Sequence, residues 1–207
     1  MEGSRATKAA AARRSAILAV AFEAFIQDGY AGTSMSSIAA RLGGSKGTLY
    51  NYFSSKEELL AAVVREKGEV VYAQLTEIPT GGPDLRKTLT EIGMKLAHIG
   101  LDYEFLAFYR LAIAESGRFP EIGAAVYDMG QRRALVPLTD FLESAMSAGT
   151  IRVGDALEAA QFFFDLCLAV ILRRRLLAAP PEADEAVIRR NVERAVSLFL
   201  VEYRPGG

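Results

Sequence analysis

The sequence predicts an all-α protein with an N-terminal three-helix domain of the helix-turn-helix type and a larger C-terminal helical domain, about nine helices in all. Apolar residues recur three and four positions apart along most of the chain, as they do on one face of a helix. No segment shows the alternating pattern of a strand between hairpin turns. With 207 residues, 51% of them hydrophobic, the chain has room for one domain or two small ones and has the composition of a globular protein.

The first four predicted helices are two short helices between two longer ones. Gly29 is expected to end the first helix, since glycine readily adopts the left-handed conformation that closes a helix. Thr33 is the expected N-cap of the second helix, which Gly43-Gly44 ends, and Ser45 caps the third. The pair Ser54-Ser55 supplies the cap of the fourth. The expected spans are about 7–28, 34–42, 46–53 and 56–78.

The remaining chain is predicted to form a helical body after a break at Pro79 and Gly81-Gly82-Pro83. Pro137 should bend the third helix of this body, because proline lacks a backbone donor and clashes with the preceding turn. We expect a first domain over residues 1–56, with its helix-turn-helix at about 34–53, and a second over 57–207, joined through the helix 56–78. The expected body helices span about 84–100, 103–116, 120–148, 155–178 and 182–203.

A helix-turn-helix pattern lies within residues 35–54. Ala39 is small where two helices approach closely, Gly43 allows the positive φ of a tight turn, and Leu49 points inward. The first 56 residues carry seven basic and three acidic side chains, although the net charge of the whole chain is only −1. Because phosphate contacts need local positive charge, this distribution favours a region that binds a polyanion; the alternative is a solvated tail.

Four segments extend this pattern: GYAGTSM at 29–35, IA at 38–39, SKGTLYNYF at 45–53 and KEEL at 56–59. Together they closely resemble the N-terminal DNA-binding region of the TetR family of bacterial transcriptional regulators. The resemblance covers roughly residues 13–64, and beyond it only the helical plan and the length agree. Gly44 departs from the family, which commonly has a small aliphatic residue there, and a second glycine loosens the turn.

The outer side of the third helix is predicted to contact DNA. Lys46 can reach guanine edges or phosphate, Gly47 lets the backbone approach closely, and Tyr50 can donate to phosphate, a division that the family resemblance also implies. The alternative is that the tyrosines pack on the first helix and the serines only cap helices. The predicted residues on or beside the third helix are Ser45, Lys46, Gly47, Thr48, Tyr50 and Asn51. The predicted phosphate anchors are Thr33, Ser34, Ser36, Tyr52 and Lys56.

The last two helices carry apolar stripes that are expected to pair two copies of the chain as a four-helix bundle, which the family resemblance also implies. A single recognition helix contacts few base pairs, so a dimer would be needed for useful specificity. The alternative is that each stripe serves only the intramolecular core. The predicted dimer residues are Phe164, Leu168, Ile171, Leu172, Val192, Val196 and Phe199.

Large aromatic residues concentrate in the middle helices and suggest a cavity for a small apolar or amphipathic effector, although most of them are expected in the core. A surface or core role is the alternative for His98, and Cys167 is expected to be a buried small hydrophobe. The candidate effector-binding residues are His98, Tyr103, Phe105, Phe108, Tyr109, Glu115, Tyr127, Phe162 and Asp165.

The function expected from these features is that of a ligand-responsive transcriptional repressor. A homodimer would bind a palindromic double-stranded DNA operator and leave it when a small-molecule effector binds. The alternative is a helical small-molecule carrier or scaffold without sequence-specific DNA binding. No catalytic motif such as HExxH or GxSxG occurs, so an enzyme is not expected.

Composition also bears on cofactors and location. One cysteine and one histidine leave too few ligands for a usual zinc site, so neither a metal nor another cofactor is expected. No apolar run is long enough for a membrane span, and the N-terminus lacks the apolar core of a signal peptide. We therefore expect a cytoplasmic protein with no membrane partner.

Overall fold

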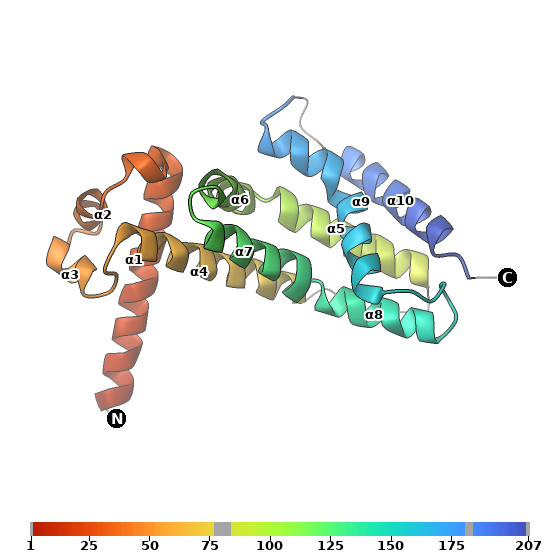
Figure 1. The fold of residues 1–207 in the computed structure, drawn as a ribbon, viewed down its shortest axis with the longest axis horizontal. Helices are drawn as coiled ribbons and strands as arrows, with labels where there is room; N and C mark the ends of the chain where they lie inside the picture. Colours follow the sequence, from red (N-terminus) through yellow and green to blue (C-terminus); the bar gives the residue numbers. More distant parts are fainter. Residues whose placement is uncertain (1, 77–83, 181–183, 206–207) are drawn as a thin grey trace. The chain divides into compact units, whose positions relative to one another are not determined.

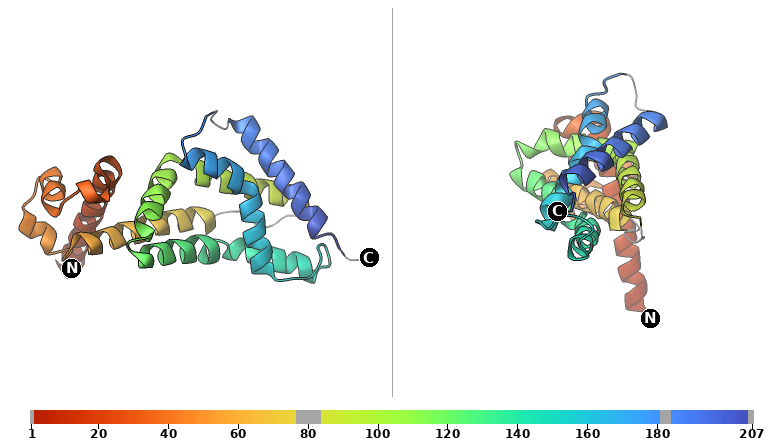
Figure 2. Two further views of the ribbon diagram at one scale, coloured as in Figure 1. Left: turned by 45° about the horizontal axis from the view of Figure 1, so that its top comes forward. Right: turned by 90° about the vertical axis from the view of Figure 1, so that its right-hand side faces the viewer.

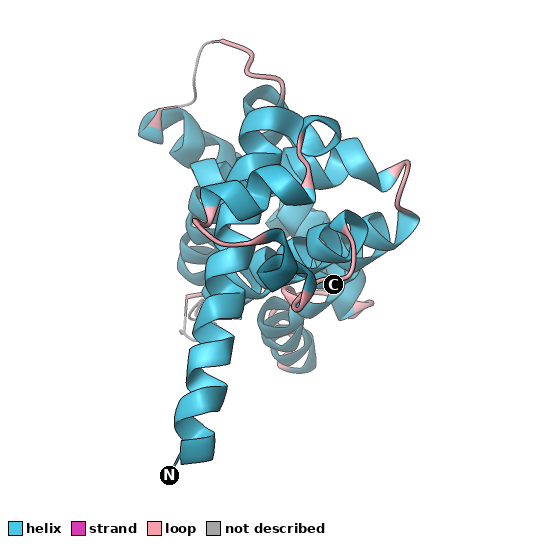
Figure 3. Cartoon of the chain, turned by 90° about the vertical axis from the view of Figure 1, so that its left-hand side faces the viewer, coloured by secondary structure: helices cyan, strands magenta, loops and turns pink. Residues whose placement is uncertain are grey.

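The computed structural model describes residues 2–76, 84–180 and 184–205, and within these ranges the chain forms helices and no strand (Figure 3). The predicted break at 79–83 and the predicted start of the last helix at Glu182 lie outside the described residues. None of the described helices has the length and apolar character needed to cross a membrane. The helices are α1 (Glu2–Gly32), α2 (Met35–Arg41), α3 (Lys46–Tyr50), α4 (Lys56–Thr76), α5 (Leu85–Leu101), α6 (Tyr103–Ser116), α7 (Pro120–Asp128), a π-helix (Met129–Arg133), α8 (Val136–Ser147), α9 (Ala156–Leu176) and α10 (Glu185–Glu202) (Figure 1).

Contacts divide the chain into two compact units, which we call the N-terminal unit, residues 1–68 and 107–126, and the body unit, residues 69–106 and 127–207. This division differs from the predicted boundary at residue 56. The first turns of α4 bury Leu59 and Leu60 in the N-terminal unit, and most of α6 and α7 joins the same core. The helix-turn-helix is therefore part of a larger folding unit than the sequence indicated.

The core of the N-terminal unit fixes α2 and α3 by their apolar faces (Figure 1). Ile38 of α2 and Leu49 of α3 are buried against α1, and Phe53 closes the turn that follows α3. Burying each such side chain contributes about 1.5–3 kcal/mol, which holds two helices that are too short to be stable alone. Further core residues of this unit are Phe22, Phe25, Leu59, Phe108, Leu111 and Ile122.

Two glycines shape the helix-turn-helix through a positive φ. Gly29 (φ 72°) breaks the helical path near the end of α1, as predicted, and Gly43 (φ 63°) follows α2. The N-cap of α2 is Ser34, whose hydroxyl accepts from the Ser37 backbone N–H, so the predicted cap at Thr33 is wrong by one residue. Thr33 is instead buried and donates its hydroxyl to backbone carbonyls of α1.

A cluster around Tyr30 joins the end of α1 to the start of α4. The Tyr30 hydroxyl donates to Glu57 Oε1 at 3.0 Å, and Lys56 Nζ lies 4.2 Å from the centre of the Tyr30 ring. The same ammonium donates to the carbonyl oxygens of Tyr30 and Thr33, each at 2.8 Å. Phe119 meets the Tyr30 ring edge to face. The Lys56 ammonium thus gives both carbonyl oxygens a charged donor, in addition to the Thr33 backbone N–H from which the Tyr30 carbonyl accepts at 3.3 Å.

In the body unit, α5, α9 and α10 pack side by side and α8 packs on α9 (Figure 2). Gly93 of α5 lies where the three helices meet, since an added Cβ would come within 2.7 Å of Val192 Cγ1 and 3.1 Å of Cys167 Sγ. Asn191 Nδ2 donates to the Cys167 carbonyl oxygen at 2.6 Å and ties α10 to α9. Cys167 is buried, as predicted, and burial raises the pKa of its thiol to about 12.

This core uses the apolar stripes that the sequence assigned to a dimer interface. Five of the predicted dimer residues are buried within one chain, and two are partly buried against the same core. The five residues that are buried within one chain are not accessible to a second copy, so for them the alternative of an intramolecular core fits the structure, while Phe164 and Leu172 stay predicted interface residues. The five buried residues are Leu168, Ile171, Val192, Val196 and Phe199, and the two partly buried residues are Phe164 and Leu172.

The predicted single helix over 120–148 is broken in the structure. It consists of α7, the π-helix and α8, and Pro137 lies in the first turn of α8 instead of bending a helix interior. Proline is tolerated there because the first helical N–H groups have no intrahelical acceptor. In the irregular stretch, Met129, Ala134 and Leu135 are buried. The prediction of one helix with a bend at Pro137 did not include this change of direction before α8.

The Tyr30 cluster predicts a pH-dependent stability. Burial and the hydrogen bond to Glu57 raise the pKa of Tyr30 to about 12, so the folded chain keeps a proton that the unfolded chain loses near pH 10. The free energy of unfolding of the Tyr30→Phe variant should be about 1 kcal/mol lower than that of the wild type at pH 7. This difference should shrink between pH 10 and 12, because the phenol of the unfolded wild type ionises there while that of the folded wild type stays protonated. Urea denaturation at pH 7 and pH 11 measures both values.

The exposed Tyr103 supplies the control, since Tyr103→Phe should leave the unfolding free energy unchanged at either pH. A Tyr30→Phe deficit of the same size at pH 7 and pH 11 would contradict the role of this phenol.

Candidate DNA-binding surface

The helix α3 is held by its inner side and presents its outer side to solvent. Ser45 caps it, with its hydroxyl accepting from the Thr48 backbone N–H at 3.2 Å, as predicted. Leu49 is the buried anchor, as predicted. The side chains of Lys46 and Asn51 are exposed. A short helix fixed in this way leaves a continuous polar face free for a partner.

Lys46 and Tyr50 form a pair on this outer face. They lie four residues apart, and Lys46 Nζ is 5.7 Å from the centre of the Tyr50 ring. Tyr50 is 44% exposed, so much of its side chain is open to solvent. Gly47 lies exposed between them, where a bare backbone allows close approach. An ammonium and a phenol on one exposed face suit both phosphate oxygens and base edges.

The serines around the two short helices have different surroundings. Ser36 is exposed on the first turn of α2, whereas the Ser34 hydroxyl is engaged with Ser37 in a capping box. The Ser45 and Thr48 hydroxyls lie 3.0 Å apart. Tyr52 is half-buried and packs against the N-terminal core. Ser36 is therefore the serine whose hydroxyl is most available to a phosphate.

Two predicted phosphate anchors are corrected by the structure. Thr33 is only 2% exposed, and its hydroxyl is directed at the Ala24 and Gly29 carbonyls, so it cannot reach a phosphate. The Lys56 ammonium faces the Tyr30 ring and two backbone carbonyls, so its charge is used inside the fold. Sequence patterns could not show this, because both residues acquire their partners from chain segments far away in the sequence.

The other basic side chains of this region either contact residues of the same unit or lie beside the turn before α3. Arg41 donates to Asp28 at 2.6 Å, and the Arg14 guanidinium lies over the Phe53 ring. Arg13 lies beside the turn of the helix-turn-helix, since an added Cβ at Gly44 would come within 3.2 Å of Arg13 Nη2. The glycine that departs from the family pattern thus makes room for a guanidinium next to α3.

The candidate effector-binding residues are divided between the two units. Phe108, Tyr109 and Glu115 lie in the N-terminal unit, where Phe108 is part of the core. In the body unit, Tyr103 and Tyr127 are exposed on the surface. An effector-binding role for Tyr103, Tyr109, Glu115 and Tyr127 stays a prediction.

The remaining four effector candidates lie in the body unit. His98 is exposed and pairs with Glu185 at 2.9 Å, which confirms the surface alternative for this histidine. Phe162 and Asp165 are exposed on α9, and partial burial raises the pKa of the Asp165 carboxyl. Phe105 is half-buried. Phe162 and Asp165 are three residues apart and therefore lie on one exposed face of α9.

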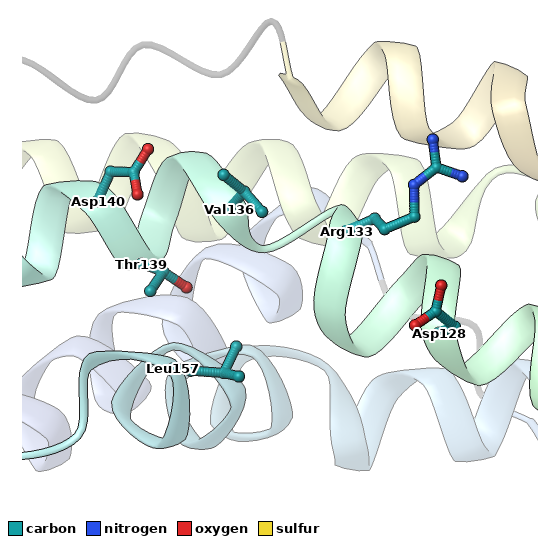
Figure 4. A pocket seen from close by; sticks show the side chains of 6 residues that line it. All are labelled: Asp128, Arg133, Val136, Thr139, Asp140 and Leu157. Carbon is teal, nitrogen blue, oxygen red and sulfur yellow. The ribbon is translucent and has the colours of Figure 1, made fainter.

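A hollow that the sequence did not indicate lies in the body unit where the π-helix leads into α8 (Figure 4). It has a volume of about 380 Å³, within the range of small-molecule sites. No sequence signal could have found it, because it depends on the break in the predicted helix 120–148. Its lining residues are Asp128, Arg133, Val136, Thr139, Asp140 and Leu157.

Two family models match the chain. Residues 17–63 match the family model for bacterial regulatory proteins of the tetR family, and residues 87–205 match that for the C-terminal domain of AefR-like transcriptional repressors. The HTH-type transcriptional regulator RutR of Escherichia coli (strain K12) is 41% identical over 69 residues, 33% of this chain and 32% of RutR. The regulator UidR of the same organism is 29% identical over 133 residues, 64% of each chain. The matched regions thus span less than two thirds of either relative.

Solved structures agree over nearly the whole chain. A TetR-family transcriptional regulator from Mesorhizobium loti MAFF303099 is 29% identical with a TM-score of 0.82, covering 93% of this chain and 97% of its own. The flavonoid-responsive regulator FrrA is 28% identical with a TM-score of 0.80, covering 95% and 100%. With both sequence models and these folds in agreement, the chain belongs to the TetR family of bacterial transcriptional regulators.

Proposed function

We propose that this chain represses transcription as a homodimer that binds a palindromic DNA operator and leaves it when a small-molecule effector binds. The observation that carries the proposal is the outer face of α3, where Lys46 and Tyr50 are exposed beside a glycine on a helix anchored by Leu49. Such a regulator acts in the cytoplasm, where its operator is. A carrier that does not bind DNA would have no use for a cationic outer face on α3.

The contacts on DNA follow from the chemistry of each side chain. Lys46 donates to guanine edges or to phosphate, and Tyr50 donates to phosphate. Thr48, half-exposed at the start of α3, contacts a thymine methyl or a base edge, and Asn51 at its C-cap lies within reach of adenine. Ser36 and Arg13 flank α3 and hold the phosphate backbone, which fixes the position of the helix without reading sequence.

The dimer interface lies on the outer faces of α9 and α10, because the inner faces form the core. Phe162 and Val170 on α9 and Leu198 and Val201 on α10 are 42–62% exposed, an unusual number of large apolar side chains for two neighbouring helices. Asp165 lies on the same face of α9 as Phe162, one turn away. A second copy of the chain would cover these residues in a four-helix bundle with two-fold symmetry.

The effector is proposed to be a small organic molecule that binds in the body unit. FrrA, which is 28% identical to this chain, is described as flavonoid-responsive. Flavonoids are therefore one class to include in an effector screen. An effector releases DNA only if it binds more tightly to the conformation in which the two recognition helices do not fit the operator.

Substitutions on α3 test the recognition face. Lys46→Ala and Tyr50→Ala should each weaken binding to an operator selected from random duplexes by about 1–3 kcal/mol, because each removes a contact to a base or a well-placed phosphate. Fluorescence anisotropy at fixed salt measures the affinity, and circular dichroism checks that the variants are folded. The matched control is Lys87→Ala, an exposed lysine on α5, which should bind as the wild type does. Wild-type affinity in both α3 variants would refute the assignment.

A charge on the outer face of α10 tests the dimer. Leu198→Glu should shift the sedimentation mass from dimer to monomer, since it places a carboxylate in a desolvated interface without removing any core residue. Val153→Glu, at a residue 78% exposed before α9, should remain dimeric and serves as the control. A Leu198→Glu protein that stays dimeric would show that the interface lies elsewhere.

A further inference from the structure

The outer faces of α9 and α10 carry opposite charges near the middle of each helix. On α9, Asp165 is exposed one turn after Phe162. On α10, Arg194 is exposed one turn before Leu198. Each charge therefore lies beside a large exposed apolar side chain, in a surface that loses its water if a second copy of the chain covers it.

The two charged residues lie at the same level along the helix pair. Asn191 Nδ2 of α10 donates to the Cys167 carbonyl oxygen of α9 at 2.6 Å. The ring centres of Phe163 and Phe199 are 5.2 Å apart, so α9 and α10 run antiparallel. The carboxylate belongs to the residue halfway between these two α9 positions, and the guanidinium to a residue within one position of halfway on α10. The rise of 1.5 Å per residue places both at nearly one height.

Neither charge is neutralised within its own chain. Among the residues that the structure describes, Asp165 and Arg194 have no hydrogen-bond or ion-pair partner. Burial raises the pKa of the Asp165 carboxyl, and no donor or cation offsets this effect. A partly buried carboxylate without a counter-charge is stabilised by a cation that another molecule supplies.

We infer that Asp165 of one copy pairs with Arg194 of the partner subunit, so that α9 of each copy packs on α10 of the other. A two-fold axis along the bundle brings these helices face to face at one level and forms the pair twice. A two-fold axis across the bundle at this level would set like charges against each other, which is strongly disfavoured. The inference rests on the proposed homodimer and adds which helices meet and which charges orient them.

Reversal of the two charges tests the pair. In Asp165→Arg two guanidinium groups meet at each contact, and in Arg194→Asp two carboxylates meet. Each variant alone should therefore raise the dimer dissociation constant at least about tenfold, measured by sedimentation over a dilution series. The double variant should dimerise as the wild type does. A mixture of the two single variants restores opposite charges at both contacts, so native mass spectrometry should find the mixed dimer in excess over random pairing.

The matched control reverses charges on α5. Glu91→Arg and Lys87→Asp make the same changes of charge at exposed positions of that helix. Gly93 faces α9 and α10, and Glu91 lies two residues before it, on the opposite side of α5. These two variants should dimerise as the wild type does and should mix at random. Circular dichroism checks that every variant is folded, as expected for substitutions of exposed side chains.

Three results would overturn the inference. Random mixing of Asp165→Arg with Arg194→Asp subunits would mean that the two charges do not meet. Equal weakening by the α5 variants would indicate a general effect of surface charge. A wild-type protein that stays monomeric would refute the proposed homodimer and the pair with it, whereas a dimeric wild type whose variants mix at random refutes the pair alone.

Discussion

The Lys56 ammonium holds together the part of the N-terminal unit on which the outer face of α3 depends. It donates to two carbonyl oxygens at the end of α1, where Gly29 has broken the helical path, and it lies on the Tyr30 ring. A charge-assisted bond of this kind is stronger than one between neutral groups, and it ties the start of α4 to the end of α1. Since α2 and α3 lie in the chain between these two attachment points, the start of α4 and the end of α1 together confine them.

The Lys56 ammonium has its partners inside the fold, so other basic side chains supply the positive charge at the surface of this region. The Lys56 charge is used by partners inside the fold and Arg41 pairs with Asp28 at the surface, whereas Lys46 and Arg13 lie at the surface of α3 and its turn. The positive charge of this region therefore serves two purposes, and only the outer part is available to DNA. In the body unit, the inner faces of α9 and α10 form the core, while their outer faces carry exposed apolar residues.

Sequence patterns were reliable where the cause is local. The cap at Ser45, the positive φ at Gly43 and the inward position of Leu49 follow from residues a few positions apart, and the structure confirms all three. The burial of Thr33 and Lys56 could not be predicted, because their partners come from distant segments. Periodicity also did not show that five residues of the predicted dimer stripe lie in the core, because α9 and α10 each carry apolar residues on two faces. The hollow beside the π-helix was missed because the sequence appeared to continue as one helix.

Selection of bound duplexes from a random DNA pool, followed by a salt titration of the best binder, tests most directly whether the outer face of α3 reads DNA. The structure predicts an enriched palindrome with half-sites about one helical turn or somewhat more apart, and an affinity that falls steeply with salt as phosphate contacts are screened. Recovery of no common sequence by a folded, ligand-free preparation would contradict the account and would favour a carrier of small molecules instead.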